Sequence, residues 1–166
     1  MKDTKSLKLA EQNHNLAKAL IEKCQDRHIL ATAESCTGGL LSAKLTDISG
    51  SSSVFDRAFI TYSNAAKIQM LDVQKMTLRQ FGAVSEQVAN EMLQGALNNS
   101  NANISISITG IAGPGGGTAA KPVGTICFSW GSKYQQNTCT KHFSGVREEI
   151  RAQAVNFALT KLVEFV

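Results

Sequence analysis

The residues best suited to chemistry lie in one short stretch, AESCTGG, at residues 33–39. An apolar run precedes it, and a helical pattern of apolar residues follows it to Ile48. This order predicts a strand that passes through a tight turn directly into a helix. A serine on such a turn, here Ser35, can act as a nucleophile, with the next N–H groups as an oxyanion hole. It can also simply cap the helix, which is the commoner role of serine there.

The start of this helix is also a candidate anion site. Ser35 and Thr37 both stand where a capping hydroxyl would stand, beside N–H groups that have no partner within the helix. Gly38 and Gly39 would let a ligand approach the backbone closely.

Lys67 is the second candidate. It follows the next predicted strand, residues 54–62, so it and Ser35 could meet at one edge of the sheet. A lysine accepts a proton only if its surroundings lower its pKa from about 10.4 to about 7–8. Tyr62, at the end of the same strand, could hold the lysine or relay a proton. Spacing alone favours a solvent-exposed lysine, and Ser63 is a rival nucleophile whose position suits a helix cap better.

A glycine-rich stretch, TGIAGPGGGT, occupies residues 109–118. It is not a Walker loop, because Gly116 stands where that motif requires lysine. A loose dinucleotide fingerprint also fails, because a strand follows instead of a helix. The stretch is either a surface connection or a loop whose N–H groups line a pocket for an anion or an amide, and the pocket is favoured.

The remaining polar residues do not suggest a metal or a cofactor. The three histidines have no partner at metal-ligand spacing, which argues against a zinc site and against a Ser-His-Asp triad. Arg147 and Arg151 share one face of the last predicted helix with acidic neighbours. We expect that face to be solvated, with Arg147 as the arginine that could reach a phosphate.

Helices and strands alternate early in the chain, and a hairpin follows later. The pattern predicts a single α/β domain over residues 1–166, with three layers (α/β/α) and a mixed sheet. Strands are expected at residues 29–33, 54–62 (buried), 104–109, 123–130 and 134–143. Helices are expected at residues 7–24, from the glycines to Ile48, at 64–70, around Leu78, after Ser85 to Leu97, and from about 145.

Composition excludes several classes of protein. The 166 residues are 43% hydrophobic and 18% charged, which is ordinary for a soluble globular domain. The net charge of +4 is scattered, so it gives no footprint for nucleic acid. No stretch approaches the roughly 18 apolar residues of a membrane span, and no apolar signal core is present. The four cysteines lie far apart, which favours free thiols and a cytoplasmic protein.

Five motifs together point to a family. They are ESCTGG (34–39), TYSNAAK (61–67), GAVSE (82–86), TGIAGPGG (109–116) and KPVGT (121–125). In this order they resemble the C-terminal domain of the competence/damage-inducible CinA proteins, which also occurs alone as nicotinamide-nucleotide amidase. The resemblance covers about residues 29–151.

The resemblance implies a Ser/Lys amidohydrolase of pyridine nucleotide recycling that converts nicotinamide mononucleotide to nicotinate mononucleotide and ammonia, without metal or cofactor. It implies that Ser35 is the nucleophile, Lys67 the base and Tyr62 its helper, which reverses the preference for a capping Ser35. The implied substrate-binding residues are Thr37, Gly38, Gly39, Asn64, Thr109, Gly110, Gly113 and Arg147.

Two positions depart from the family pattern. Ala65 stands where the family usually has glutamate, and Val146 stands where a polar residue usually precedes Arg147. A catalytically silent, nucleotide-binding paralogue that acts as a sensor or interaction module is therefore the alternative function. In either case the expected partner is a small nucleotide rather than nucleic acid or a membrane. The oligomeric state, a homo-oligomer included, stays open.

Overall fold

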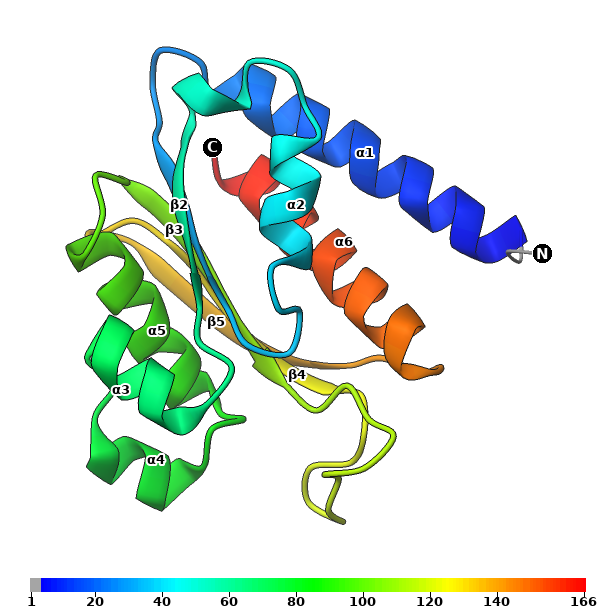
Figure 1. The fold of residues 1–166 in the computed structure, drawn as a ribbon, viewed down its shortest axis with the longest axis vertical. Coiled ribbons are helices and arrows are strands. Elements are labelled where there is room, and N and C mark those ends of the chain that lie inside the picture. Colours follow the sequence, from blue (N-terminus) through cyan, green and yellow to red (C-terminus); the bar gives the residue numbers. More distant parts are fainter. Residues whose placement is uncertain (1–3) are drawn as a thin grey trace.

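The computed structural model describes residues 4–166, which build a five-stranded mixed sheet between two layers of helices (Figure 1). The strand order is β2-β1-β3-β4-β5. β1 is parallel to both β2 and β3, whereas β4 is antiparallel to both of its neighbours, β3 and β5. The predicted α/β fold with a mixed sheet is therefore confirmed. The strands are β1 (Leu30–Glu34), β2 (Phe55–Ile60), β3 (Ile104–Gly110), β4 (Thr125–Gly131) and β5 (Gln136–His142).

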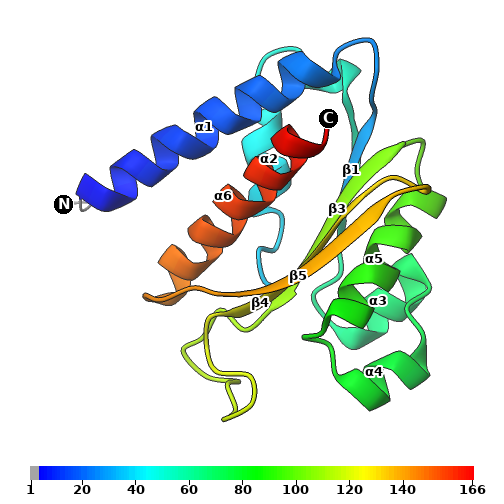
Figure 2. The ribbon, with the colours of Figure 1, turned by 180° about the vertical axis from the view of Figure 1, so that it is seen from behind.

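A layer of helices lies on each side of the sheet, as Figures 1 and 2 show from opposite sides. One layer contains α1 (Thr4–Cys24), α2 (Leu40–Thr46) and α6 (Arg147–Phe165). The other contains α3 (Asn64–Leu71), α4 (Lys75–Phe81) and α5 (Glu86–Asn98). A short 3₁₀ helix, Ser51–Ser53, precedes β2. Each helix and strand expected from the sequence is present, with ends that differ by a few residues.

Strand β3 separates the two cores, because its side chains alternate between the faces. Its isoleucines, such as Ile106, pack in the larger core with α1, α2 and α6. Its small hydroxyl residues face the opposite layer, where the Ser107 hydroxyl donates a hydrogen bond to the Ala89 carbonyl of α5 at 2.5 Å. Short side chains that satisfy their own polar groups let α5 lie close to the sheet.

Helix α3 packs directly on α5 at a glycine. A Cβ atom added to Gly95 would lie 2.1 Å from the carbonyl oxygen of Leu71, the last residue of α3. Real atoms do not approach so closely, so any larger residue at position 95 would displace α3. This contact sets the position of the helix that carries Lys67.

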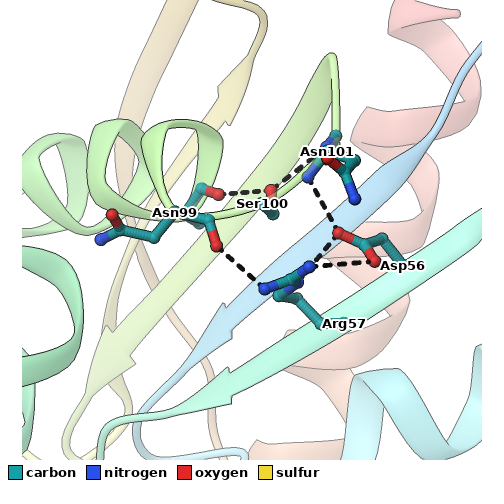
Figure 3. A network of polar contacts seen from close by, with 7 residues as sticks. Asp56, Arg57, Asn99, Ser100 and Asn101 are labelled. Atoms are coloured by element: carbon teal, nitrogen blue, oxygen red, sulfur yellow. Dashed lines mark hydrogen bonds and ion pairs between the residues drawn. The ribbon is translucent and has the colours of Figure 1, made fainter.

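Strand β2 was predicted to be buried, and this prediction is wrong. β2 lies at the edge of the sheet, and Phe59 is its only buried residue. Near the end of β2 that pairs with Leu30, a polar network joins the strand to the turn after α5 (Figure 3). Asp56 accepts hydrogen bonds from the Asn101 N–H and from Arg57, both at 2.9 Å. Arg57 also donates to the Asn99 carbonyl at 3.2 Å, which ties the turn after α5 to the sheet edge.

Two sequence expectations concern the thiols and membranes. The four cysteines are free, as predicted, and only Cys139 is not fully buried. Within residues 4–166, no helix has both the length and the apolar character needed to span a membrane.

Candidate active site

The fold brings Ser35 and Lys67 together at one edge of the sheet. β1 and β2 are parallel neighbours, and the Thr61 N–H extends their pairing by donating to the Glu34 carbonyl at 2.9 Å. Ser35 directly follows β1, whereas Lys67 lies in the first turn of α3 and its side chain reaches back toward the start of that helix. Lys67 Nζ lies 2.9 Å from Ser35 Oγ. The two groups are therefore within proton-transfer distance of each other.

Lys67 is almost completely buried, with only 1% of its surface exposed. Its Nζ also donates a hydrogen bond to the Thr61 carbonyl at 2.8 Å, and within residues 4–166 no carboxylate forms an ion pair with it. Burial therefore lowers the pKa of this amine from 10.5 to about 8, because the charged form loses its hydration. The solvent-exposed alternative is wrong, and a neutral amine is accessible near neutral pH.

The Glu34 carboxylate holds the turn that carries Ser35. Glu34 is fully buried, yet within residues 4–166 no basic side chain pairs with it. Instead it accepts hydrogen bonds from three N–H groups and two hydroxyls. The N–H donors are Gly39, Leu41 and Ser42, at 2.9–3.1 Å. The hydroxyl donors are Ser42 at 2.6 Å and Thr32 at 3.3 Å.

Glu34 overturns the predicted capping roles of Ser35 and Thr37. The residue that precedes α2 is Gly39, in the left-handed region at φ 95°, and its cap has no side-chain hydrogen bond. Neither Ser35 nor Thr37 caps the helix, because the Glu34 side chain already satisfies its first N–H groups. A second anion cannot use those donors. Among the residues that the structure describes, Lys67 is the one hydrogen-bond partner of Ser35 Oγ.

Some of the backbone N–H groups at and after Ser35 already donate hydrogen bonds, and others do not. The Ser35 N–H donates to the Ile108 carbonyl, and the Gly38 N–H donates to the Ser35 carbonyl. The Cys36 N–H donates no hydrogen bond to another residue within residues 4–166. Within residues 4–166 the Thr37 N–H has no hydrogen-bond acceptor. Thr37 is therefore a better oxyanion donor than Gly38, whose N–H already donates to the Ser35 carbonyl.

Tyr62 and Arg147 form a second polar group near the turn. The Arg147 guanidinium donates to the Tyr62 hydroxyl at 2.8 Å and to the Gly113 carbonyl at 2.7 Å. It thereby connects α6, the segment between β2 and α3, and the glycine-rich loop. The Tyr62 ring lies 4.0 Å from where a Cβ of Gly38 would stand. Its hydroxyl is bonded to Arg147, and within the described residues it makes no hydrogen bond to Lys67 or Ser35.

Arg151 is a residue whose role sequence reasoning missed. Its guanidinium donates to the carbonyls of Cys36 and Thr37, at 3.1 and 2.7 Å. The expectation that Arg151 lies on a solvated face is therefore wrong. The only signal in the sequence was its spacing from Arg147, which places both side chains on one face of α6.

Three further predicted substrate-binding residues are Asn64, Thr109 and Gly110, and the structure shows what each of them contacts. Asn64 is exposed at the start of α3, after Ser63, whose hydroxyl caps the helix by accepting from the Ala66 N–H at 3.0 Å. Thr109 is buried, and its hydroxyl donates to the Ala83 carbonyl at 2.8 Å. Gly110 packs against β4, where a Cβ atom would lie 2.3 Å from Ile126. Thr109 and Gly110 therefore have packing roles that explain their types.

The comparison with protein families is decisive for identity. The sequence model of one protein family, described as the CinA C-terminal domain, matches residues 13–166. The chain belongs to this family. It is 54% identical to nicotinamide-nucleotide amidohydrolase PncC of Enterobacter agglomerans over 136 residues. These residues make up 81% of this chain and 83% of that protein. The PncC protein of Escherichia coli K12 is 45% identical over 98% of this chain and 95% of its own length.

Longer CinA proteins and solved structures agree with this assignment. A CinA-like protein of Syntrophobacter fumaroxidans is 50% identical over 89% of this chain, which spans 35% of that longer protein. The crystal structure of competence/damage inducible protein CihA from Agrobacterium tumefaciens superposes with a TM-score of 0.89 at 44% identity, over 92% of this chain and 94% of that one. A CinA superfamily structure from Escherichia coli superposes with a TM-score of 0.88 at 40% identity, over 92% of this chain and 89% of that one.

The two departures from the CinA motifs lie at the surface. Ala65 is exposed on the first turn of α3, and Val146 is 67% exposed at the start of α6. Valine has no polar atom with which to cap a helix, so only the reverse contact forms: the Val146 N–H donates to Glu149 at 2.9 Å. Neither side chain takes part in the contact between Ser35 and Lys67. Within the described residues, no group of three or more His, Cys, Asp or Glu side chains could hold a metal ion.

Proposed function

We propose that this protein hydrolyses the carboxamide of nicotinamide mononucleotide, giving nicotinate mononucleotide and ammonia, by a Ser/Lys mechanism. The observation that carries the proposal is the 2.9 Å contact between Ser35 Oγ and the buried amine of Lys67. The PncC relatives, named as nicotinamide-nucleotide amidohydrolases, support the choice of substrate. We place the reaction in pyridine nucleotide recycling in the cytoplasm, the compartment that free thiols favour.

The first half of the reaction forms an acyl-enzyme. The neutral amine of Lys67 accepts the Ser35 hydroxyl proton as Oγ attacks the carboxamide carbon. The Thr37 N–H donates to the oxygen that becomes negatively charged in the tetrahedral intermediate. The carbon–nitrogen bond then breaks, and the amide nitrogen takes the proton from the Lys67 ammonium and leaves as ammonia.

The second half regenerates the enzyme. Water attacks the acyl carbon, and Lys67, neutral again, accepts a proton from it. The ester bond to Ser35 breaks, and Oγ recovers its proton from Lys67. The carboxylic acid that forms releases its remaining proton to solvent, and the product leaves as a carboxylate. The same two side chains therefore serve both steps, without a third ionisable group.

Arg147 supplies a charged group for the phosphate of the substrate. It lies at the start of α6 beside the glycine-rich loop, and its side chain is exposed. Within residues 4–166 no carboxylate forms an ion pair with it. Tyr62 fixes the guanidinium through its hydroxyl, and we assign Tyr62 as a helper of catalysis through this contact. The exposed residues Asn64 and Gly38 complete the rim of the proposed site.

Ammonia release from purified protein tests the proposal. Wild-type protein incubated with nicotinamide mononucleotide should release one ammonia for each nicotinate mononucleotide formed, and Ser35→Ala protein should release none. Binding of the mononucleotide by calorimetry without any ammonia would instead favour the silent paralogue. In that case the changes at Ala65 and Val146 would be the first to revert.

A further inference from the structure

The guanidinium of Arg151 lies against the backbone that follows the nucleophile. Nε donates to the Cys36 carbonyl at 3.1 Å, and Nη2 donates to the Thr37 carbonyl at 2.7 Å. The side chain is half-buried, and within residues 4–166 no carboxylate forms an ion pair with it. Burial raises the pKa of the neighbouring Cys36 thiol, and the positive charge of Arg151 opposes this rise in part. Arg151 therefore directs an uncompensated positive charge at two peptide groups.

The geometry of the peptide bond turns this contact into a constraint on the oxyanion donor. The Cys36 carbonyl and the Thr37 N–H belong to one planar trans peptide, so they point in opposite directions. Fixing the carbonyl on Arg151 fixes the direction of the N–H. A cation at the carbonyl oxygen also polarises the peptide and strengthens its N–H as a donor. The second contact, on Thr37, anchors the next peptide in the same way.

Glu34 and Arg151 hold the same turn from different groups. Glu34 accepts from the N–H groups of Gly39, Leu41 and Ser42, whereas Arg151 donates to the carbonyls of Cys36 and Thr37. Between the two sets of contacts, the Thr37 N–H is left without an acceptor among the described residues. Such a turn is preorganised for an oxyanion, because its free donor cannot rotate to find another partner.

We propose that Arg151 is a positioning residue that orients and polarises the Thr37 N–H toward the oxyanion. The inference rests on the proposed function, because it assigns a supporting residue to the same site. It separates the two arginines of α6. Arg147 contacts Tyr62 and Gly113 on the substrate side, whereas Arg151 acts through the backbone of the turn.

The test compares Arg151→Met and Arg151→Lys with a matched control, Arg57→Met. Arg57 also donates to a backbone carbonyl (Figure 3), but it pairs with Ala31 near the start of β1, whereas Ser35 follows the other end of that strand. Arg151→Met should lower kcat on nicotinamide mononucleotide by about 10–100-fold and leave KM nearly unchanged, since the lost stabilisation exists only in the transition state. Arg151→Lys should recover part of the loss, and Arg57→Met should match wild type.

A fluorophosphonate probe separates this inference from the choice of substrate. Ser35 Oγ bonds to phosphorus, the phosphorus–fluorine bond breaks, fluoride leaves and Lys67 takes the serine proton. The phosphoryl oxygen then occupies the oxyanion position. Labelling of Arg151→Met should slow by a factor similar to the loss in kcat, with the same pH midpoint as wild type. If wild type is labelled but releases no ammonia from the mononucleotide, the proposed substrate fails and the labelling rates alone decide the role of Arg151.

Three results would overturn the inference. Unchanged kcat and labelling in Arg151→Met would remove the positioning role. A loss confined to KM, and absent with nicotinamide riboside, would make Arg151 a phosphate ligand instead. A shifted pH midpoint would mean that it acts through Lys67. If thermal melting shows that Arg151→Met does not fold, Arg151→Lys decides by the same readouts, and wild-type values in that variant would refute the need for the paired contact.

Discussion

Removing the Lys67 amine should change both the activity and the pH dependence of stability. The pKa of Lys67 is lowered from 10.5 to about 8, which at 1.36 kcal/mol per unit corresponds to about 3 kcal/mol against the charged form. At pH 7 about a tenth of the protein then carries a neutral amine, which is a few hundred times the fraction expected for a free lysine. This fraction sets the rate of the first chemical step.

The rate should follow the neutral amine. We expect kcat to rise about tenfold per unit below pH 7 and to level off above about pH 8, with a single apparent ionisation. Lys67→Met should be inactive, and Lys67→Arg nearly so, because arginine does not lose its proton in this range. A plateau that extends unchanged down to pH 6 would show that Lys67 is not the base.

Stability should show the same ionisation with a defined sign. Between about pH 8 and 10.5 the unfolded chain binds a proton at Lys67 that the folded protein has lost, so the free energy of unfolding rises with pH across this window. Lys67→Met has no such proton. Its stability relative to wild type should therefore be highest below pH 8 and fall by about 3 kcal/mol as the pH approaches 10.5.

Urea denaturation of both proteins at several pH values measures this difference. Packing changes caused by methionine shift the curves by a constant, and the other ionisable groups are common to both proteins. The Cys36 thiol, with its pKa raised from 9.0 to about 12 by burial, has its own effect on stability above about pH 9, and both proteins contain it. A stability difference that stays constant from pH 7 to 10.5 would refute the argument that burial lowers the pKa of Lys67.

Three further predictions concern the neighbouring groups. Ser35→Ala should abolish ammonia release but lower the free energy of unfolding by only about 0.5–1.5 kcal/mol, since one hydrogen bond is lost; substantial remaining turnover would exclude Ser35 as the nucleophile. Nicotinamide riboside should show kcat/KM about 10–150-fold below that of the mononucleotide, and Arg147→Met should lower only the mononucleotide value; equal values for the two substrates would mean that no phosphate site operates. Glu34→Gln should lower the unfolding free energy by about 1–3 kcal/mol in urea denaturation, because its amide group would face N–H donors; an unchanged midpoint would show that Glu34 does not hold the turn.

Local patterns were sufficient to predict most of the fold. The alternation in β3 and the caps at Ser63 and Ser85 depend on neighbours in the sequence, and the structure contains each of them. The exposed edge position of β2 could not be predicted in this way, and its predicted burial was wrong. Its apolar residues suit a central strand, but its place at the sheet edge depends on which strands pair, and one polar network at its start depends on a turn more than 40 residues away.

The candidate site was predictable where a motif placed residues at strand ends. The expected meeting of Ser35 and Lys67 follows from two parallel neighbouring strands, and the structure brings them together. Glu34 was overlooked because it belongs to a strand, although a carboxylate five residues before a helix N–H can reach that helix. Arg151 lies 114 and 115 positions from its partners, and no local pattern carries such information.

The contact between α3 and α5 makes the catalytic geometry depend on a residue with no chemistry of its own. Lys67 stands one turn before Leu71, whose carbonyl oxygen leaves no room for a side chain at Gly95. A helix is stiff along its axis, so a displacement imposed at Leu71 is carried to the amine. Even 1 Å of added separation between Nζ and Oγ would break their hydrogen bond, which is 2.9 Å long. The activity of this protein is therefore sensitive to substitution at a helix-packing position, Gly95, which a search for polar residues would pass over. A larger residue there would inactivate the protein although its catalytic side chains stayed unchanged.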